Sequence, residues 1–405
     1  LISNVKMHEH QSNYKKAMKS GNCLLAIEQA EKAGVAGRIW LGMKDTLEVM
    51  ETHDSSTVIT PTQNDSAGNN EIWRISGTYW SLYKAYYCQA NFLKENEECK
   101  NALSYYSKAG IVLGKLEQIS GEEHVEKAFL LNKLALCYQE LGDYTAADSL
   151  YVDAIQTYKI AKDSMDVNLA QFFSNLGNSF AEQNHFEISN KLFKKSNDIF
   201  KESTNSDSRL NIINNNHSLI LNYLKEDSLI NAVETIDKTF ILVDSNTTYF
   251  CKTQLYQGVY HHNLYEYQKA INVYNKCLSC YQKILSPTHQ NIAEVNHLLA
   301  RTKIEIADYK EADKHINIGK RITLKNFGQE SVQYASFLTT TAHMEALLAN
   351  YIESEQKYRQ AIYLITNQLG TRNDRLPTCL VGLAHVELSL AKYTDAKAHS
   401  DSAIV

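Results

Sequence analysis

The sequence is poor in the residues that break helices. It has only three prolines and sixteen glycines in 405 residues. Because these two residues disfavour the interior of a helix most strongly, their scarcity favours helix throughout the chain. Basic clusters are also missing: 41 lysines and arginines stand against 46 acidic residues and form no block. We therefore expect no direct nucleic-acid binding, which needs a basic patch.

Long apolar segments are missing too. No run of about 18 apolar residues occurs, so we expect no membrane span. The first ten residues lack the apolar core of a signal peptide. The chain begins at Leu1 without methionine, and a removed leader or a truncation stays an open alternative. The eight cysteines are scattered, several at helix-packing positions where a free thiol acts as a small hydrophobe. This usage predicts a reducing, cytoplasmic compartment.

Motifs for catalysis or metal binding are not found. The two glycine-rich phosphate loops are lacking, and so is the zinc motif H-E-x-x-H. Cys277 and Cys280 have ligand-like spacing, but a structural zinc site takes four ligands, so helix packing is the preferred interpretation and a redox or zinc role the alternative. The His8-Glu9-His10 stretch has no partner ligands and is interpreted as an ordinary mobile terminus. We expect no cofactor, no metal and no catalytic site in these residues.

The sequence does contain a motif that recurs about every 42 residues. It places a small residue, where two helices touch, beside large residues that fill the space around it. Steps of three and four put these positions on one helical face. The small residue of the second helix in each copy, which we call the packing residue, is found at Ala102, Ala147, Ser189, Ala232, Ala270, Ala312, Ser354 and Ala396.

The first helix of each copy has its own small residue twelve places earlier. This residue is Ala or Gly in all copies except one, which has Ile220. The same copy contains the polar run Asn214-Asn215-Asn216 and is followed by the shortest interval, 38 residues. We expect the repeat that contains Ile220 to pack less closely than the others and to be the site of a local bend.

A period in this range is typical of stacked helical hairpins. The predicted fold is all-α: a right-handed α-solenoid, or superhelix, of stacked antiparallel helix pairs. Residues 71–405 form the array of about eight repeats, residues 1–52 a degenerate helical cap with a further helix near 37–50, and residues 53–70 a flexible loop rich in Ser, Thr, Asn and Asp. The last repeat stops with Ala403 and Ile404 still on the periodic face. We therefore expect the parent chain to continue, or another subunit to cover this end.

The repeats resemble the tetratricopeptide repeat family. A unit near 42 residues is similar to the longer subtype of kinesin light chains, and the phrases at 121–124 and 131–135 carry that likeness. The aromatic residue usual near the start of the first helix is mostly absent. The resemblance implies that first helices line a groove for a protein or extended peptide.

Candidate groove residues are solvent-facing positions around the small residue of each first helix. They are Asn132, Lys133, Gln139, Ser174, Asn175, Asn178, His217, Lys252, His262, His297, Arg301, His343 and His385. Carboxamides match the donors and acceptors of an extended backbone, and the resemblance implies that Asn132 and Asn175 are groove asparagines. Lys252 and Arg301 suit an acidic side chain or a terminal carboxylate, and the histidines would make binding pH-sensitive. The alternative is a solvated helix face without a ligand.

Three functional hypotheses follow. The first is a protein-interaction scaffold that binds a protein or peptide in the groove. The second is a regulatory arm of a larger enzyme with its catalytic domain beyond residue 405, because similar arrays precede caspase-like CHAT proteases in bacteria. The third is a free-standing enzyme. The parent reading frame and its downstream sequence separate the first two hypotheses.

Overall fold

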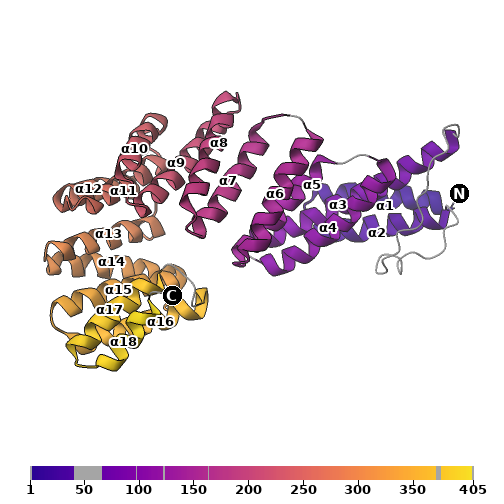
Figure 1. The fold of residues 1–405 in the computed structure, drawn as a ribbon. Helices are drawn as coiled ribbons and strands as arrows, with labels where there is room; N and C mark the ends of the chain where they lie inside the picture. The colour runs from indigo at the N-terminus through magenta and orange to yellow at the C-terminus, as the bar shows by residue number, and fades with distance from the viewer. Residues whose placement is uncertain are drawn as a thin grey trace. The chain divides into compact units, whose positions relative to one another are not determined.

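The computed structural model describes residues 2–40, 66–96, 98–121, 124–162, 164–370 and 375–403, which form helices joined by short turns and contain no strand. The helices pair in chain order, from α1 with α2 to α7 with α8 and from α11 with α12 to α17 with α18 (Figure 1). Their bounds are α1 Ile2–Lys19, α2 Cys23–Trp40, α3 Ser66–Glu95, α4 Cys99–Ser120, α5 Val125–Glu140, α6 Tyr144–Ala161, α7 Val167–Glu182, α8 Phe186–Glu202, α9 Ser208–Lys225, α10 Leu229–Leu242, α11 Thr248–Asn263, α12 Tyr267–Ile284, α13 Gln290–Glu305, α14 Tyr309–Phe327, α15 Val332–Leu347, α16 Tyr351–Leu369, α17 Leu376–Ser389 and α18 Tyr393–Ser402.

The repeat positions are confirmed by burial. All eight packing residues are at most 2% exposed. The large residue four places later is also buried in seven copies, as at Tyr106, Tyr151 and Phe193. Ser400, its counterpart in the last copy, is exposed. The periodic face therefore forms the seam between paired helices, as the spacing predicted.

A left-handed residue ends the first helix of each pair from α5 onward. In the α5–α6 turn it is Gly142, with φ of 81°, and in the α13–α14 turn it is Ala307, with φ of 57°. Glycine adopts this conformation at little steric cost, whereas alanine is strained there. The turn geometry is thus imposed by the packing of the two helices, and it recurs even where the local residue disfavours it.

The chain divides into two compact units, Leu1–Asn215 and Asn216–Val405. The division lies inside the polar run of α9, five residues before Ile220. It is the place where the sequence predicted looser packing, although the bend itself stays a prediction. We call the two parts unit 1 and unit 2 and describe each separately.

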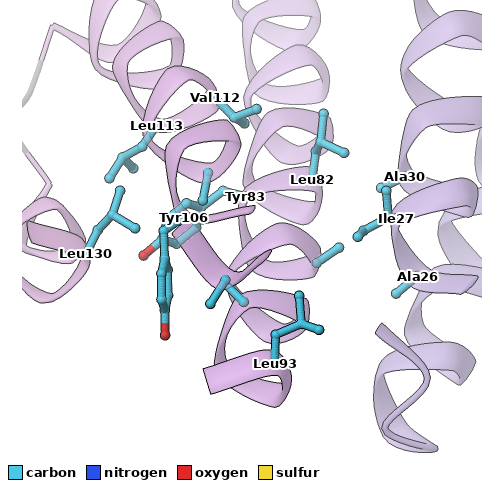
Figure 2. Packing of buried hydrophobic residues seen from close by; sticks show 14 of the residues in the cluster. Ala26, Ile27, Ala30, Leu82, Tyr83, Leu93, Tyr106, Val112, Leu113 and Leu130 are labelled. Carbon is cyan, nitrogen blue, oxygen red and sulfur yellow. The ribbon is translucent and has the colours of Figure 1, made fainter. Parts of the chain in front are cut away.

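The core of unit 1 shows how the N-terminal residues join the array. Ala26 and Ile27 of α2 face Leu82 of α3, and Tyr106 of α4 lies on the other side of the same cluster (Figure 2). Burial of a side chain the size of Ile27 or Leu82 stabilises the fold by roughly 1.5–3 kcal/mol. The α1–α2 pair is therefore an additional helical hairpin packed on the first repeat.

Two boundary predictions need comment. Residues 66–70 belong to α3, so the prediction of a loop over 53–70 is wrong for its last five residues. Residues 53–65 lie outside the described residues, and so does most of the helix expected near 37–50. Serine and asparagine disfavour helix only mildly, and Gly68 is the one stronger breaker in this stretch. Continuation into the long helix α3 outweighs both preferences.

The cysteines divide into two classes. Cys99, Cys137, Cys277 and Cys379 are free and buried, as expected for small hydrophobes. Cys251 and Cys280 instead form a disulfide between α11 and α12, and Cys23 and Cys88 form one between α2 and α3. Helix packing, the preferred interpretation of Cys277 and Cys280, is therefore confirmed for Cys277 and wrong for Cys280, because linear spacing does not show which residues two helices bring together. The compartment stays a prediction.

Candidate partner-binding surface

The candidate residues lie on the odd-numbered first helices, whose neighbours in the array contact one another. In unit 1, α5 contacts α7, and in unit 2 the contacts run from α11 to α13, α15 and α17 in turn. We call the surface that these helices present the first-helix face. It repeats the same positions at intervals of one repeat.

In unit 1, the two predicted groove asparagines bind each other. Asn175 of α7 donates to the amide oxygen of Asn132 on α5 at 2.9 Å, and Gln171 donates to Asn175 at 3.0 Å. Asn132 and Asn175 are 6% and 9% exposed. The expectation that they face solvent is therefore wrong, because a buried carboxamide is stable only when its polar atoms are paired and the nearest partner is the next repeat.

Ser174 and Gln139 turn toward their own hairpins. The Ser174 hydroxyl lies 2.7 Å from that of Ser196 on α8 and is 3% exposed, which contradicts its prediction as a solvent-facing residue. Gln139 is half-buried and accepts a 2.7 Å hydrogen bond from the Tyr151 hydroxyl of α6. Both positions lie at the edge between the buried and the exposed sides of their helices. At such an edge, sequence spacing does not show whether a side chain is buried or exposed.

Lys133 and Asn178 are half-buried on the first-helix face. Burial lowers the pKa of Lys133, and the nearby charge of Lys94 adds to that effect. A half-buried ammonium among first helices would interact with an anionic ligand more strongly than a fully solvated one.

In unit 2, three predicted histidines form bonds between repeats. His217 of α9 lies 3.0 Å from the Thr253 hydroxyl of α11, and His297 of α13 lies 2.6 Å from that of Thr340 on α15. His262 of α11 contacts the Thr302 hydroxyl of α13 at 3.0 Å. His217 is only 2% exposed, so its prediction as a solvent-facing residue is wrong. These contacts hold successive first helices together.

The same burial keeps two of these rings neutral. Burial lowers the pKa of His217 to about 3, helped by Lys252, and lowers that of His297 to about 3, helped by Arg301. Burial also lowers the pKa of His262, again with help from Arg301. A neutral imidazole has one acceptor and one donor nitrogen, which suits it to a threonine hydroxyl.

We expect unit 2 to lose stability in mild acid. The folded-state pKa of His217 and His297 lies below the unfolded value near 6.5, so their contribution is present above about pH 6.5 and is lost as pH falls toward 3. Each histidine should cost about 1.4 kcal/mol at one pH unit below 6.5. Urea unfolding between pH 7.5 and 5.5 measures this loss. A His217→Leu variant should show a shallower slope, and an unchanged slope would contradict the assignment.

The remaining predicted residues are exposed on the first-helix face of unit 2. They are Lys252 of α11, Arg301 of α13, His343 of α15 and His385 of α17. Arg301 forms no ion pair with any residue that the structure describes. Desolvation against the neighbouring helices lowers the pKa of His343, Glu305 opposes that effect, and Arg301 and His385 add to it. This part of the face is thus available to a ligand and rich in cationic groups.

Threonine is the residue type that sequence reasoning missed. Thr253, Thr302 and Thr340 complete the bonds between repeats, and each lies 36 to 43 residues from its histidine. A signal existed, since a histidine and a hydroxyl about one repeat apart on successive first helices are placed to meet.

Other features of the surface lie elsewhere. A cavity of about 440 Å³ is lined by Phe250, Gln254 and Lys283, and one of about 630 Å³ by Lys94, Cys99 and Glu140. Neither lining includes a predicted residue. Among the described residues, no cluster of three or more His, Cys, Asp or Glu is arranged to hold a metal ion. Every described helix is too short or too polar to cross a bilayer.

Comparison with known proteins identifies the repeat. Residues 130–161, which contain the end of α5 and all of α6, match the model of the tetratricopeptide repeat. This segment of the chain is therefore a tetratricopeptide repeat. A search of the curated proteins found no match to the chain.

Several solved structures share the fold of this chain. The apo form of the quorum sensor NprR from B. thuringiensis has a TM-score of 0.58 at 15% identity, over 89% of this chain and 98% of that one. Aspartyl phosphate phosphatase F from Bacillus subtilis has a TM-score of 0.58 at 10% identity, over 98% and 92%. The Rap conjugation gene regulator of plasmid pLS20, solved with the Phr* peptide, has 0.53 at 13%, over 81% and 94%. Identities this low show a common fold alone.

Proposed function

We propose that the protein is an interaction scaffold that binds an extended peptide or a protein segment on the first-helix face of unit 2. The observation that carries this proposal is the division among the predicted residues. Asn132, Asn175, His217 and His297 form bonds within the array, whereas Lys252, Arg301, His343 and His385 remain exposed. The exposed residues combine a permanent charge with imidazoles.

Arg301 is the centre of the proposed surface. Its charge acts on His262, His297 and His343, which lie on three successive first helices. A guanidinium is always charged and presents its donors in a planar fork that fits a carboxylate. Arg301 has no ion-pair partner among the described residues, and its charge acts on side chains of three first helices. Such an arginine favours a ligand that carries negative charge.

The comparisons support a peptide ligand indirectly. A structure of the same fold, the Rap conjugation gene regulator of plasmid pLS20, was solved in complex with the Phr* peptide. The fold is thus compatible with peptide binding. That these residues hold no catalytic site, bind no nucleic acid and act in the cytoplasm stays a prediction from the sequence, and so does the regulatory arm of a larger enzyme.

We expect Arg301→Ala to weaken peptide binding at least tenfold. Loss of a charge-assisted hydrogen bond costs about 1.5–3 kcal/mol, and the exposed side chain is not needed for folding. Random twelve-residue peptides are selected by display on the full chain, and the dissociation constants of the enriched peptides are measured by fluorescence anisotropy. Arg321→Ala, which removes an exposed arginine from α14, is the matched control. Absence of any selected peptide, or equal affinity for both variants, would contradict the proposal.

A further inference from the structure

Three consecutive first helices of unit 2 carry a cationic or imidazole side chain at one repeat position. Arg301, His343 and His385 each directly follow the small residue of α13, α15 and α17, and they are 42 residues apart. All three are exposed, and the three helices contact one another in sequence. The side chains therefore form a row across the helices, which we call the 301–343–385 row.

The acidic groups near this row are mostly engaged elsewhere. Within their hairpins, Lys303 pairs with Asp308 at 2.8 Å, Lys357 pairs with Glu345 at 3.7 Å, and His399 contacts Glu387 at 2.8 Å. Arg359 of α16 pairs with Glu387 of α17 in the next hairpin at 2.7 Å. From α14, Lys320 lies over the Tyr334 ring. Within the row Glu305 of α13 acts on His343, and it also acts on His262 and Tyr267 of neighbouring elements. The arginine and two imidazoles of the row are therefore able to accept anions.

The spacing of the row sets the form of its ligand. Packed helices lie about 8–10 Å apart. A peptide in the polyproline II conformation has three residues per turn and a rise of about 3.1 Å, so every third side chain points the same way at intervals of about 9 Å. Acidic residues at every third position would therefore meet three successive helices. Arginine and protonated histidine both donate to carboxylates.

We propose that the 301–343–385 row binds an acidic peptide segment with a carboxylate at every third position, and that His343 takes up a proton as the segment binds. This inference rests on the proposed function and names its ligand class. Arg301 holds one carboxylate at any physiological pH. His343 holds a second only when charged, and a bound carboxylate favours the charged ring. Because the complex binds more protons than the free chain, affinity rises as pH falls.

The state of the free row agrees with this scheme. The pKa of His343 is lowered, chiefly by desolvation, with Glu305 opposing and Arg301 and His385 adding to the effect. Without a ligand the ring is therefore neutral at neutral pH. The peptide carboxylates, with an ordinary pKa near 4.3, stay ionised above pH 6. Any proton taken up on binding between pH 8 and 6 therefore goes to the protein and not to the peptide.

The test uses the full chain and a labelled nine-residue peptide with Glu at its second, fifth and eighth positions and Pro between them. At constant ionic strength, we expect the dissociation constant to be at least fivefold lower at pH 6.0 than at pH 8.0. A peptide with Gln at the three positions should not bind, and one with the three Glu adjacent should bind at least fivefold more weakly. Circular dichroism at both pH values checks that the chain stays folded.

The variant that isolates the histidines is His343→Gln with His385→Gln. It should keep weak binding through Arg301 but lose the pH dependence, whereas His185→Gln, at an exposed histidine of α8's N-cap, should behave as wild type. Equal affinity at both pH values, or unchanged pH dependence in the double variant, overturns the inference. If display-selected peptides depend on Arg301 while the Glu probe fails, only this inference is wrong. If no peptide binds at all, the proposed function itself fails.

Discussion

Replacing Asp166 with alanine is expected to lower the free energy of unfolding of unit 1 by about 2–3 kcal/mol. Asp166 is the N-cap of α7 and accepts from the backbone amides of Asn168 and Leu169. Its carboxylate also accepts from the Tyr158 hydroxyl and the Lys162 ammonium, each at 2.7 Å. One side chain thus completes a helix terminus and joins α6 to α7, the connection between two repeats.

The pKa of Asp166 predicts whether its contribution to stability rises or falls with pH. Burial alone would raise the pKa of Asp166, but the bonds from Lys162, Tyr158 and the backbone outweigh it and hold the pKa at about 2. A depressed folded-state pKa means that the stabilisation is present above the unfolded value near 3.9 and is lost as pH falls toward 2. A shift of nearly two pKa units corresponds to about 2.5 kcal/mol.

Urea unfolding of the full chain at pH 7, followed by circular dichroism, measures the effect of Asp166→Ala. Hydrogen exchange at the first turn of α7 should accelerate as well, because that turn loses its cap. Asp153→Ala, at an exposed aspartate of α6, is the matched control and should change stability by less than about 0.5 kcal/mol. Equal stability of the two variants would show that the Asp166 hydrogen bonds contribute little net free energy.

Replacing Gly319 with alanine should destabilise unit 2 by about 2–3 kcal/mol. A Cβ at this position of α14 would lie 2.5 Å from the Phe337 ring of α15 and 3.1 Å from the carbonyl oxygen of Ala293 on α13. Phe337 is 3% exposed and Ala293 is fully buried, so neither neighbour can move aside freely. The strain falls between the two helices that carry Arg301 and His343, and peptide affinity should fall along with stability.

Gly114→Ala provides the contrasting measurement. Nothing lies within 4 Å of a Cβ built at Gly114, which is inside α4. Alanine there should be neutral or should stabilise the helix by up to about 1 kcal/mol, because glycine has the lower helix propensity. Thermal unfolding of both variants would show opposite changes, and a Gly319→Ala chain as stable as wild type would mean that the hairpins adjust their separation easily.

Lowering the pH should have two opposite effects on unit 2. It should lower the stability of the fold and raise the affinity for an anionic ligand. Protonation of His217 or His297 weakens contacts within the array, because both rings are held neutral by burial. Protonation of His343 would instead strengthen the binding of an anionic ligand. The two effects separate by position: the first pair lies buried or half-buried between helices, and His343 is exposed on the face.

The array was predictable because its information is periodic and local. Seven of the eight copies repeat a small residue and a large neighbour. A two-helix unit that cannot bury its apolar stripe alone must stack on the next. The burial of residues such as Ala147 and Tyr151 could therefore be predicted from the repeat spacing. The polar run at 214–216 likewise marked the place where the chain divides into two units.

The sequence by itself thus determined the helical repeat, its period and its packing seam. Tertiary structure alone decided which polar residues of the first helices remain free. Asn132 and Asn175 have the polar character expected of groove residues, yet each satisfies the other, since a buried amide pairs with whatever donor or acceptor the next helix presents. His297 and His343 are both histidines on successive first helices, but one contacts Thr340 and the other faces outward. The two histidines stand at different repeat positions, three places before and one place after the small residue of their helices. The partner of His297 lies 43 residues away, and the local spacing of the chain does not reveal it.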